Sequence, residues 1–236
     1  MKVLITGATG FLGSAVLRLL IDEGYDVRVL VRKNADMRNI EEYDVKIIKG
    51  DLQNTESLKS AVYSCEQVFH VAADYRLWVP DPENMYKTNI DGTRNLILAA
   101  TDAGVEKIVY TSSVATIGTN NDGTPADEMT PSSLENMIGV YKRSKFLAEQ
   151  AVKDLVNEKS CPVTIVNPAA PVGPCDIKPT PTGKIILDTI RNRMPAYVKT
   201  GSGTDVGYNI YVGTSAGNNS LSGSNTGTAS SSWVQV

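Results

Sequence analysis

The sequence is poor in histidine and cysteine. Its 236 residues contain one histidine, His70, and three cysteines that form no CxxC pair. A zinc site needs several histidine or cysteine ligands, and a serine or cysteine triad needs a histidine base. Both kinds of chemistry are largely excluded, so we predict no metal site and expect other side chains to carry the chemistry.

Long apolar segments and an excess of positive charge are also missing. The few apolar residues before Gly7 are fewer than a signal peptide needs, and no run reaches the ~18 residues of a membrane helix. The formal net charge is -3, so no global positive field attracts nucleic acid or an anionic membrane. The sequence predicts a cytoplasmic protein with no membrane span and no nucleic-acid partner.

Charge is almost absent from residues 201–236. Ser, Gly, Thr and Asn supply 23 of these 36 positions, and Asp205 is the only charged side chain there. Apolar residues alternate over 206–212, and 232–236 could form a second strand, but an isolated hairpin is marginal in water. We therefore predict one domain over residues 1–200, followed by an unrelated low-complexity, β-prone tail over 201–236.

The first 200 residues show short apolar runs alternating with amphipathic stretches, a pattern typical of βαβ units and a parallel sheet. Strands are expected at Val3–Thr6, Val27–Val31, Val45–Lys49, Gln67–Ala72, Lys107–Thr111 and Val163–Asn167. Helices are expected at Phe11–Glu23, Glu56–Ser64, Asn84–Ala103, Val140–Glu158 and Thr182–Arg193. With right-handed crossovers, these elements predict an α/β fold with a doubly wound parallel sheet, the Rossmann fold.

A glycine-rich segment, TGATGFLG, joins the first strand to the first helix. Gly7 permits a tight turn, Gly10 lets the backbone approach a pyrophosphate, and Gly13 lets the helix pack against the sheet. The helix N-terminus presents free N–H groups and a partial positive charge. A structural turn is the alternative interpretation. We predict that a dinucleotide binds at Gly7, Thr9, Gly10, Phe11, Leu12 and Gly13.

The end of the second strand bears on which dinucleotide binds. NAD sites usually place an acid there, whereas NADP sites place an arginine that holds the 2′-phosphate. Here Arg32 and Lys33 follow the strand, which favours NADP, with NAD as the alternative. After the third strand, Asp51 and Leu52 are predicted beside the cofactor. Asp51 could accept a hydrogen bond from the adenine amino group or cap the next turn.

A candidate catalytic set lies further along the chain. Tyr141 and Lys145 are four residues apart on a predicted helix, so their side chains share one face. A phenol is a poor base at neutral pH, but a neighbouring ammonium ion favours the phenolate. Ser113 follows the fifth strand, where its hydroxyl can hydrogen-bond the same substrate oxygen. Asn89, on the preceding helix, could support Lys145 or could simply pack the helix.

These motifs, TGATGFLG, VAA at residues 71–73, NIDGT, TSS and YKRSK in this order, resemble the extended short-chain dehydrogenase/reductases, the NAD-dependent epimerase/dehydratase family. The segments around residues 71–78, 110–116 and 176–183 resemble its hopanoid-associated sugar epimerase and dihydroflavonol-reductase-like branches. The resemblance covers residues 1–200. It implies a Ser113, Tyr141 and Lys145 triad with Asn89 as a fourth member, and a homodimer built on the two long helices.

The resemblance also implies that Ala72, Ala73, Asn167 and Pro168 lie beside the cofactor. The chain departs from the family in two respects. Ala169 and Ala170 follow the Asn-Pro pair, where the family has a serine or threonine. The family also continues for roughly a hundred residues that form most of its substrate lobe, so we interpret the chain as a member that is truncated after about residue 200.

Together these features predict an NAD(P)-dependent oxidoreductase or epimerase. Hydride would pass between the nicotinamide and a carbonyl or alcohol carbon of a sugar-like or other small substrate. Epimerisation depends on the substrate lobe, so the residues leave reductase, epimerase and dehydratase open. The alternative is a nucleotide-binding remnant without turnover.

Overall fold

The computed structural model describes residues 1–76, 79–120, 122, 124–191 and 193. The chain divides into two compact units, Met1–Ala169 and Ala170–Val236. The first unit holds the sheet and its helices. The described part of the second unit contains the helix α6 (Pro181–Ile190). The predicted boundary near residue 200 and the strand candidates of the tail lie outside the described residues.

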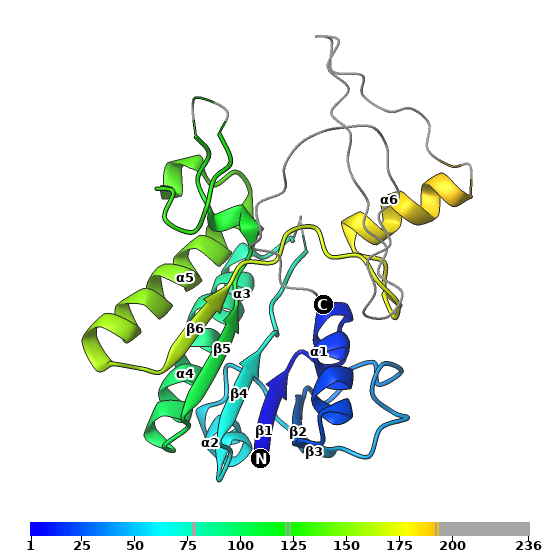
Figure 1. Ribbon diagram of the computed structural model, residues 1–236, viewed down its shortest axis with the longest axis vertical. Helices are drawn as coiled ribbons and strands as arrows, with labels where there is room; N and C mark the ends of the chain where they lie inside the picture. The colour runs from blue at the N-terminus through cyan, green and yellow to red at the C-terminus, as the bar shows by residue number, and fades with distance from the viewer. Residues whose placement is uncertain (77–78, 121, 123, 192, 194–236) are drawn as a thin grey trace. The chain divides into compact units, whose positions relative to one another are not determined.

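Six parallel strands form one sheet in the order β3-β2-β1-β4-β5-β6 (Figure 1). The strands are β1 (Lys2–Thr6), β2 (Asp26–Val31), β3 (Lys46–Lys49), β4 (Gln67–His70), β5 (Lys107–Thr111) and β6 (Val163–Val166). The order reverses between β1 and β4, the kind of switch point where open α/β sheets bind ligands. The predicted doubly wound sheet is confirmed.

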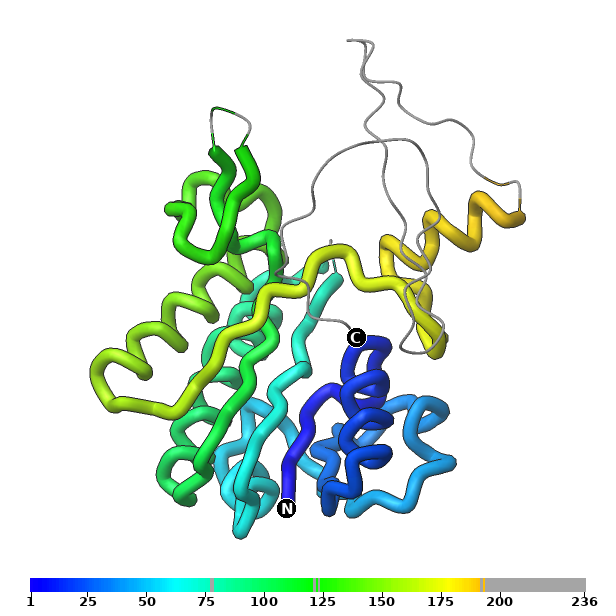
Figure 2. Tube along the Cα trace, viewed as in Figure 1, coloured from blue at the N-terminus to red at the C-terminus, as the bar shows by residue number. Residues whose placement is uncertain are grey.

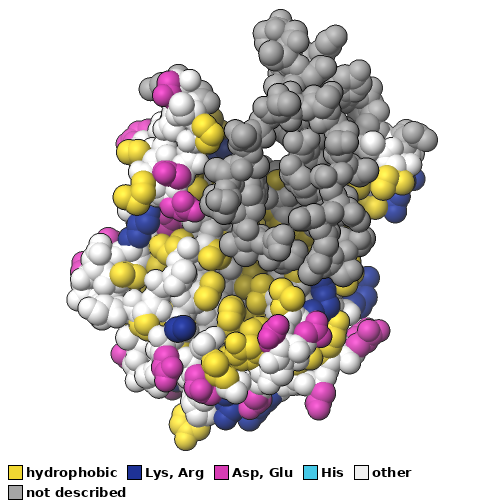
Figure 3. Space-filling model, in the orientation of Figure 1, with side chains coloured by type: hydrophobic (Ala, Val, Ile, Leu, Met, Phe, Trp, Pro, Cys, Tyr) yellow, Lys and Arg dark blue, Asp and Glu magenta, His cyan; other side chains and the backbone are white. Residues whose placement is uncertain are grey.

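Helices pack on both faces of this sheet because alternate side chains of each strand point to opposite sides. In β1, Leu4 joins the cluster formed with α2 (Thr55–Val62), α4 (Gly92–Asp102) and α5 (Val140–Lys159). Val3 and Ile5 instead pack with Leu17 and Leu20 of α1 (Phe11–Asp22). In the orientation of Figure 3, hydrophobic side chains gather over the strands, and charges of both signs are mixed around them.

The path of the chain brings the candidate site to one edge. Figure 2 shows the chain running from the N-terminus along β1, turning, and returning along α1. Thr6, the last residue of β1, pairs with Leu30 of β2 and with His70 of β4, and His70 pairs with Tyr110 of β5. The loops that follow these four strands therefore meet at the carboxyl edge of the sheet.

One predicted helix differs from the structure. The pattern predicts a regular helix over Asn84–Ala103, whereas the chain forms α3 (Pro82–Tyr86), a π-helical segment (Lys87–Asp91) and then α4. A π turn inserts one residue and changes where side chains point, and such turns are frequent at functional sites. Asn89, a predicted site residue, lies in this segment and is buried.

Several other ends were predicted one to three residues too long, among them those of α1 at Asp22 and α2 at Val62. β4 ends at His70, two residues before the predicted end, since the Val71 amide still donates to Thr6 O (3.2 Å) but the chain then leaves the sheet. β6 ends at Val166 and α6 at Ile190. Among the described residues, no helix combines the length and the apolar content needed to cross a membrane.

Candidate active site

The loop between β1 and α1 contains three glycines. At two of them, Gly7 and Gly13, a side chain would collide with neighbouring protein atoms. Gly7 has a φ of +80°, and a Cβ there would lie 2.6 Å from the Ala72 amide nitrogen. A Cβ on Gly13 would collide with the Gly7 carbonyl. Among the described residues, a Cβ on Gly10 would meet only Gly7 O, in a tight contact of 3.3 Å. The described residues therefore leave room for a ligand in front of Gly10.

The first turn of α1 supplies hydrogen-bond donors at this opening. The amides of Phe11, Leu12 and Gly13 begin the helix and are not used within it, and the Ser14 amide is the first to bond back, to Gly10 O at 3.0 Å. Buried Asn39 donates through Nδ2 to the carbonyls of Thr9 and Gly10, at 3.3 and 3.4 Å, which holds the loop in place. Free amides, the helix dipole and the space at Gly10 fit a pyrophosphate.

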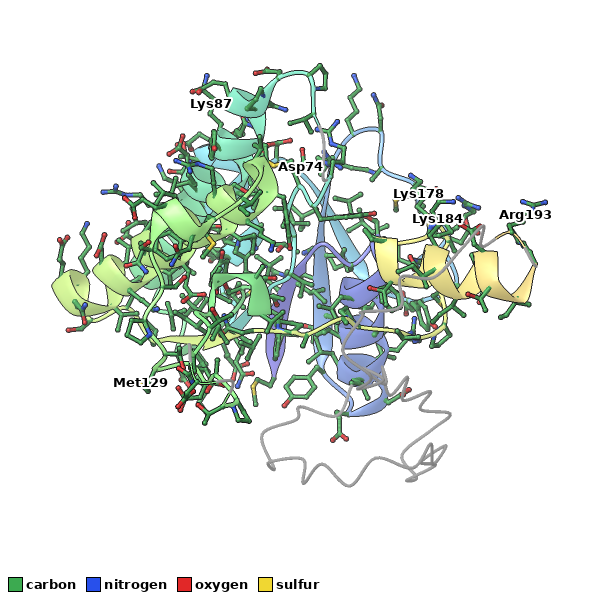
Figure 4. All side chains as sticks on the ribbon, turned by 90° about the horizontal axis from the view of Figure 1, so that it is seen from above. Asp74, Lys87, Met129, Lys178, Lys184 and Arg193 are labelled. Atoms are coloured by element: carbon green, nitrogen blue, oxygen red, sulfur yellow. The ribbon has the colours of Figure 1, made fainter. Side chains whose placement is uncertain are left out.

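Positive charge lies next to this loop. Arg32 directly follows β2, the neighbour of β1, and both Arg32 and Lys33 are exposed. Asp74, which Figure 4 labels, follows β4 and is paired with Arg76. Burial raises the pKa of Asp74, but its hydrogen bonds and ion pair with Arg76, with a smaller effect of Arg32, bring that pKa below its usual range. The positive charge of Arg32, in the loop after β2, therefore acts on Asp74 in the loop after β4.

After β3, both Asp51 and Leu52 make contacts within the protein itself. Asp51 Oδ1 accepts a hydrogen bond from the Gln53 amide (2.9 Å), so the turn-capping role of Asp51 is present. Its contact with adenine remains a prediction. Leu52 is buried in the core cluster, and a Cβ added to Gly92 of α4 would lie 2.7 Å from Leu52 Cβ. The side chain of Leu52 therefore packs, which leaves its backbone for any contact with a cofactor.

The two serines after β5 have different roles. Ser112 is buried, and its hydroxyl donates to Glu149 Oε2 (2.5 Å). Ser113 is extended, so its side chain points the opposite way, and its Oγ accepts a hydrogen bond from the Ala115 amide (3.1 Å). Because Ser113 Oγ is an acceptor in this bond, its own proton is left to donate. Of the two serines, Ser113 is therefore the one with a hydroxyl proton left for a ligand, and its contact with a substrate oxygen stays a prediction.

Lys145 is buried on α5 and points toward the end of β5. Its Nζ donates to Thr111 O (2.8 Å) and to the Tyr110 hydroxyl (3.1 Å), and it lies 4.7 Å from the centre of the Tyr110 ring. An ammonium group has three donors, so within the described residues one is left for a ligand. Burial lowers the pKa of Lys145 to about 7, although Glu149 opposes this shift. Tyr141 lies one helical turn earlier and is half-buried.

A buried polar chain connects Lys145 with the end of β1. The sequence did not predict this role for Tyr110, His70 or Thr93. His70 contacts Thr6 Oγ1 through Nδ1 (2.8 Å) and Thr93 Oγ1 through Nε2 (2.9 Å), and its ring lies 5.6 Å from the Tyr110 ring. Burial, with a smaller effect of Lys145, lowers the pKa of His70 to about 3. His70 is therefore a neutral core histidine, which agrees with its place in an apolar run.

Asn89 is a bridge between α5 and the loop after β4. Its Oδ1 accepts from the Asp74 amide (2.7 Å), and its Nδ2 donates to Asp74 O and to Ser144 Oγ, both at 2.9 Å. Figure 4 accordingly places Asp74 beside the first turns of α5. No direct bond between Asn89 and Lys145 occurs among the described residues. The contact of Asn89 is with Ser144, the residue before Lys145, and the helix-packing role is the one that the structure contains.

Asn167 and Pro168 join the end of β6 to the Ser113 loop. Asn167 Nδ2 lies within hydrogen-bond distance of Ser113 O (3.1 Å), and Pro168 O accepts from the Val114 amide (3.1 Å). Ala72 donates its amide to Thr6 Oγ1 (3.2 Å), and Ala73 follows it at the same edge. All four predicted cofactor residues thus lie at the carboxyl edge. In the described ranges no group of three or more His, Cys, Asp or Glu side chains is arranged to hold a metal ion.

A parallel doubly wound sheet with this loop at its switch point defines a dinucleotide-binding α/β protein. Residues 3–206 match the family described as the NAD dependent epimerase/dehydratase family, and the chain belongs to it. The resemblance found in the motifs is therefore confirmed. This is a family of enzymes, and the description of the family names NAD as the cofactor.

Similar proteins fit this assignment. A Synechocystis protein that carries the name dihydroflavonol 4-reductase is 47% identical over 197 residues, which are 84% of this chain and 57% of that protein. The crystal structure of gox2253 is 57% identical with a TM-score of 0.80, over 83% of this chain and 59% of that one. Thermus thermophilus UDP-glucose 4-epimerase in complex with NAD is 26% identical with a TM-score of 0.68, over 79% and 61%. The chain thus spans about three fifths of the length of these relatives.

Proposed function

We propose that this chain is the cofactor-binding and catalytic part of an NAD(P)-dependent oxidoreductase or epimerase that acts on a carbonyl or alcohol carbon of a small, sugar-like or similar substrate. The observation that carries the proposal is the state of Lys145, which is buried with two of its three donors used inside the fold. A buried ammonium with one free donor next to a half-buried tyrosine is suited to bind a ribose hydroxyl and to assist proton transfer.

The residues divide the reaction among them. The bound nicotinamide supplies the hydride when a carbonyl is reduced and accepts it when an alcohol is oxidised. Ser113 donates its free hydroxyl proton in a hydrogen bond to the substrate oxygen, and Tyr141 gives that oxygen a proton as the carbonyl carbon is reduced. The charge of Lys145 stabilises the phenolate that Tyr141 leaves behind. In the oxidation, Tyr141 removes the proton instead.

We further propose NADP as the preferred cofactor. Arg32 and Lys33 are exposed after β2, and no acidic residue occupies either position. A guanidinium binds a phosphate in two parallel hydrogen bonds, whereas a ribose hydroxyl is better held by a carboxylate. A homodimer through α4 and α5, which the family resemblance implies, is a further part of this proposal and is tested by the mass of the protein in solution.

The experiment is an assay of NADPH and NADH oxidation with a panel of aldehydes, ketones and keto sugars. The wild-type chain is compared with Tyr141→Phe, and with Tyr63→Phe as the matched control, since Tyr63 is 72% exposed and far along the chain from the site. We expect turnover that Tyr141→Phe reduces by about 10²–10⁴-fold and Tyr63→Phe leaves unchanged. Tight cofactor binding with no turnover of any carbonyl would instead identify a nucleotide-binding remnant.

A further inference from the structure

Glu149 lies two turns beyond Tyr141 on α5 and is buried among polar partners. Its Oε2 accepts from the hydroxyls of Ser112 (2.5 Å) and Thr116 (2.7 Å) and from Asn167 Nδ2 (3.0 Å). Its Oε1 forms an ion pair with Lys153 Nζ (2.7 Å), one turn further along the helix. Only 8% of the Glu149 side chain is exposed. A single carboxylate therefore contacts three separate segments of the chain.

Each of these segments carries a residue of the candidate active site. Ser112 precedes Ser113, Asn167 precedes Pro168, and α5 itself carries Tyr141 and Lys145. The partners of Glu149 also hold Ser113 directly, since Thr116 Oγ1 and Asn167 Nδ2 lie 2.8 and 3.1 Å from Ser113 O. The Thr116 hydroxyl has one proton, so it donates to Glu149 or to Ser113 O at a given moment. The carboxylate and the Ser113 carbonyl thus share two donors, Thr116 Oγ1 and Asn167 Nδ2.

The ionised carboxylate suits this place. Burial raises the pKa of Glu149, but Lys153 and the hydrogen bonds from Ser112, Thr116 and Asn167 together bring that pKa below its usual range. A carboxylate only accepts, and all four groups that face it are donors in these contacts. Hydrogen bonds to a buried charged group are about twice as strong as neutral ones. The arrangement is fully satisfied only while Glu149 is charged.

We infer that Glu149 is a positioning residue for catalysis, which holds Ser113 in register with Tyr141 and Lys145 by tying the ends of β5 and β6 to α5. The inference rests on the proposed function. It also explains why two serines follow β5, because Ser112 anchors the strand end to Glu149 and thereby leaves Ser113 for the substrate. Glu149 touches none of the reacting groups, so its effect is on their alignment.

The test compares Glu149→Gln with wild type. Glutamine keeps the size and one acceptor oxygen but has no charge. If that oxygen takes the place of Oε2, the three hydrogen bonds lose their charged acceptor, and otherwise the amide group faces Asn167 Nδ2, which is also a donor. Because small displacements of reacting groups reduce rates strongly, we expect kcat to fall by about 10- to 100-fold while KM for the carbonyl and the Kd for NADPH stay within about twofold. Glu158→Gln, the same change at an exposed position of α5, serves as the matched control.

Two further measurements make the result decisive. Thermal unfolding of each variant shows whether the protein is folded at the assay temperature. Hydrogen exchange of the amides in 112–117 should become about tenfold faster in Glu149→Gln, with no change in β1 and α1, because these amides lose their anchor. Lys153→Gln, which removes the ion pair but keeps the three hydrogen bonds, should lower kcat much less than Glu149→Gln.

The outcomes separate this inference from the proposed function. A wild-type chain that turns over a carbonyl, together with a Glu149→Gln variant of equal kcat or unchanged exchange in 112–117, overturns the inference and leaves the proposed function intact. A wild-type chain that binds NADPH but turns over no carbonyl overturns the proposed function, and with it the catalytic role of Glu149. A lower kcat with unchanged Kd, unchanged KM and faster local exchange supports the inference.

Discussion

The two sides of the candidate active site consist of different chemical groups. On the β1–α1 side, the groups that fit a pyrophosphate are backbone amides and the space left by Gly10. On the β5–α5 side, the groups are buried ionisable side chains, above all Lys145 and Glu149. Amides do not titrate in the physiological range, whereas buried side chains respond to pH and to every neighbouring charge. Changes in the β1–α1 loop should therefore weaken cofactor binding alone, whereas changes at Lys145 should act mainly on catalysis and also on its ribose contact.

The largest expected effect tests the side-chain half alone. Lys145→Met removes the buried charge next to Tyr141 but preserves an unbranched side chain. We expect kcat to fall by about 10²–10⁴-fold, because the proton transfer loses its electrostatic support. Lys142→Met, an exposed change on the same helix, is the control and should match wild type in the carbonyl assay. Equal activity of the two variants would remove Lys145 from the mechanism.

The backbone half is tested at Gly10. Among the described residues, a Cβ there contacts only Gly7 O, at 3.3 Å, so a small shift of this loop should let Gly10→Ala fold. The added methyl group occupies the space in front of the first turn of α1, and we expect the Kd for NADPH to rise by about tenfold or more, which is 1.4 kcal/mol per tenfold. Isothermal titration gives this Kd, and thermal unfolding without ligand checks the fold. Unchanged affinity would mean that the pyrophosphate does not approach Gly10.

A substitution of Arg32 tests whether the preferred cofactor carries a 2′-phosphate. Replacing Arg32 with alanine should weaken NADPH by about tenfold, the usual value of a lost hydrogen bond to a charged group, and should change NADH much less. Lys46→Ala, at the amino end of the neighbouring strand β3, provides the control, and both residues are exposed, so neither change should alter stability. The ratio of the two Kd values is the measured quantity. Equal losses for both nucleotides would contradict the assignment of Arg32 to the 2′-phosphate.

The smallest effect concerns the stability of the side-chain half. Since the pKa of His70 is about 3 in the fold and near 6.5 in an unfolded chain, the unfolded state binds the proton first as pH falls. The stability that neutral His70 contributes is complete above pH 6.5 and is lost between there and pH 3. From pH 7 to pH 6 we expect a loss of about 0.7 kcal/mol.

Urea unfolding at the two pH values measures this loss. The same pair of measurements on His70→Gln provides the control, because His70 is the only histidine in the sequence and Lys145 is present in both proteins. The loss assigned to His70 should be absent from the variant. An equal decrease in both proteins would show that other groups carry the pH dependence.

The sequence predicted the strand, glycine loop and helix of the backbone half, whereas the binding of a cofactor there stays a prediction. Local features such as the position of TGATGFLG between an apolar run and an amphipathic stretch are sufficient, since the strand, turn and helix that they specify are adjacent in the chain. The same holds for the sheet itself. Gly7 and Gly13 then follow from close contacts within the loop and with residue 72, which the spacing of the motif anticipates.

The sequence predicted the side-chain half only in part. Ser113, Tyr141 and Lys145 follow from motif and spacing, and the structure places them at one edge. The partners of Lys145 and Glu149 did not follow, because they join residues that are 18 to 37 positions apart and depend on which face of each strand is buried. The pattern of apolar residues likewise does not predict the π-helical turn at Asn89, because this turn shifts the helical register by a single residue.

Thermal unfolding of the wild-type chain with and without excess NADPH or NADH tests the central claim most directly. At about 100 times its Kd, a bound cofactor stabilises the fold by about 2.7 kcal/mol, which for this length is a shift of about 5–10 °C. We predict such a shift, larger with NADPH than with NADH at equal concentration. A cooperative transition that neither nucleotide moves would contradict the account.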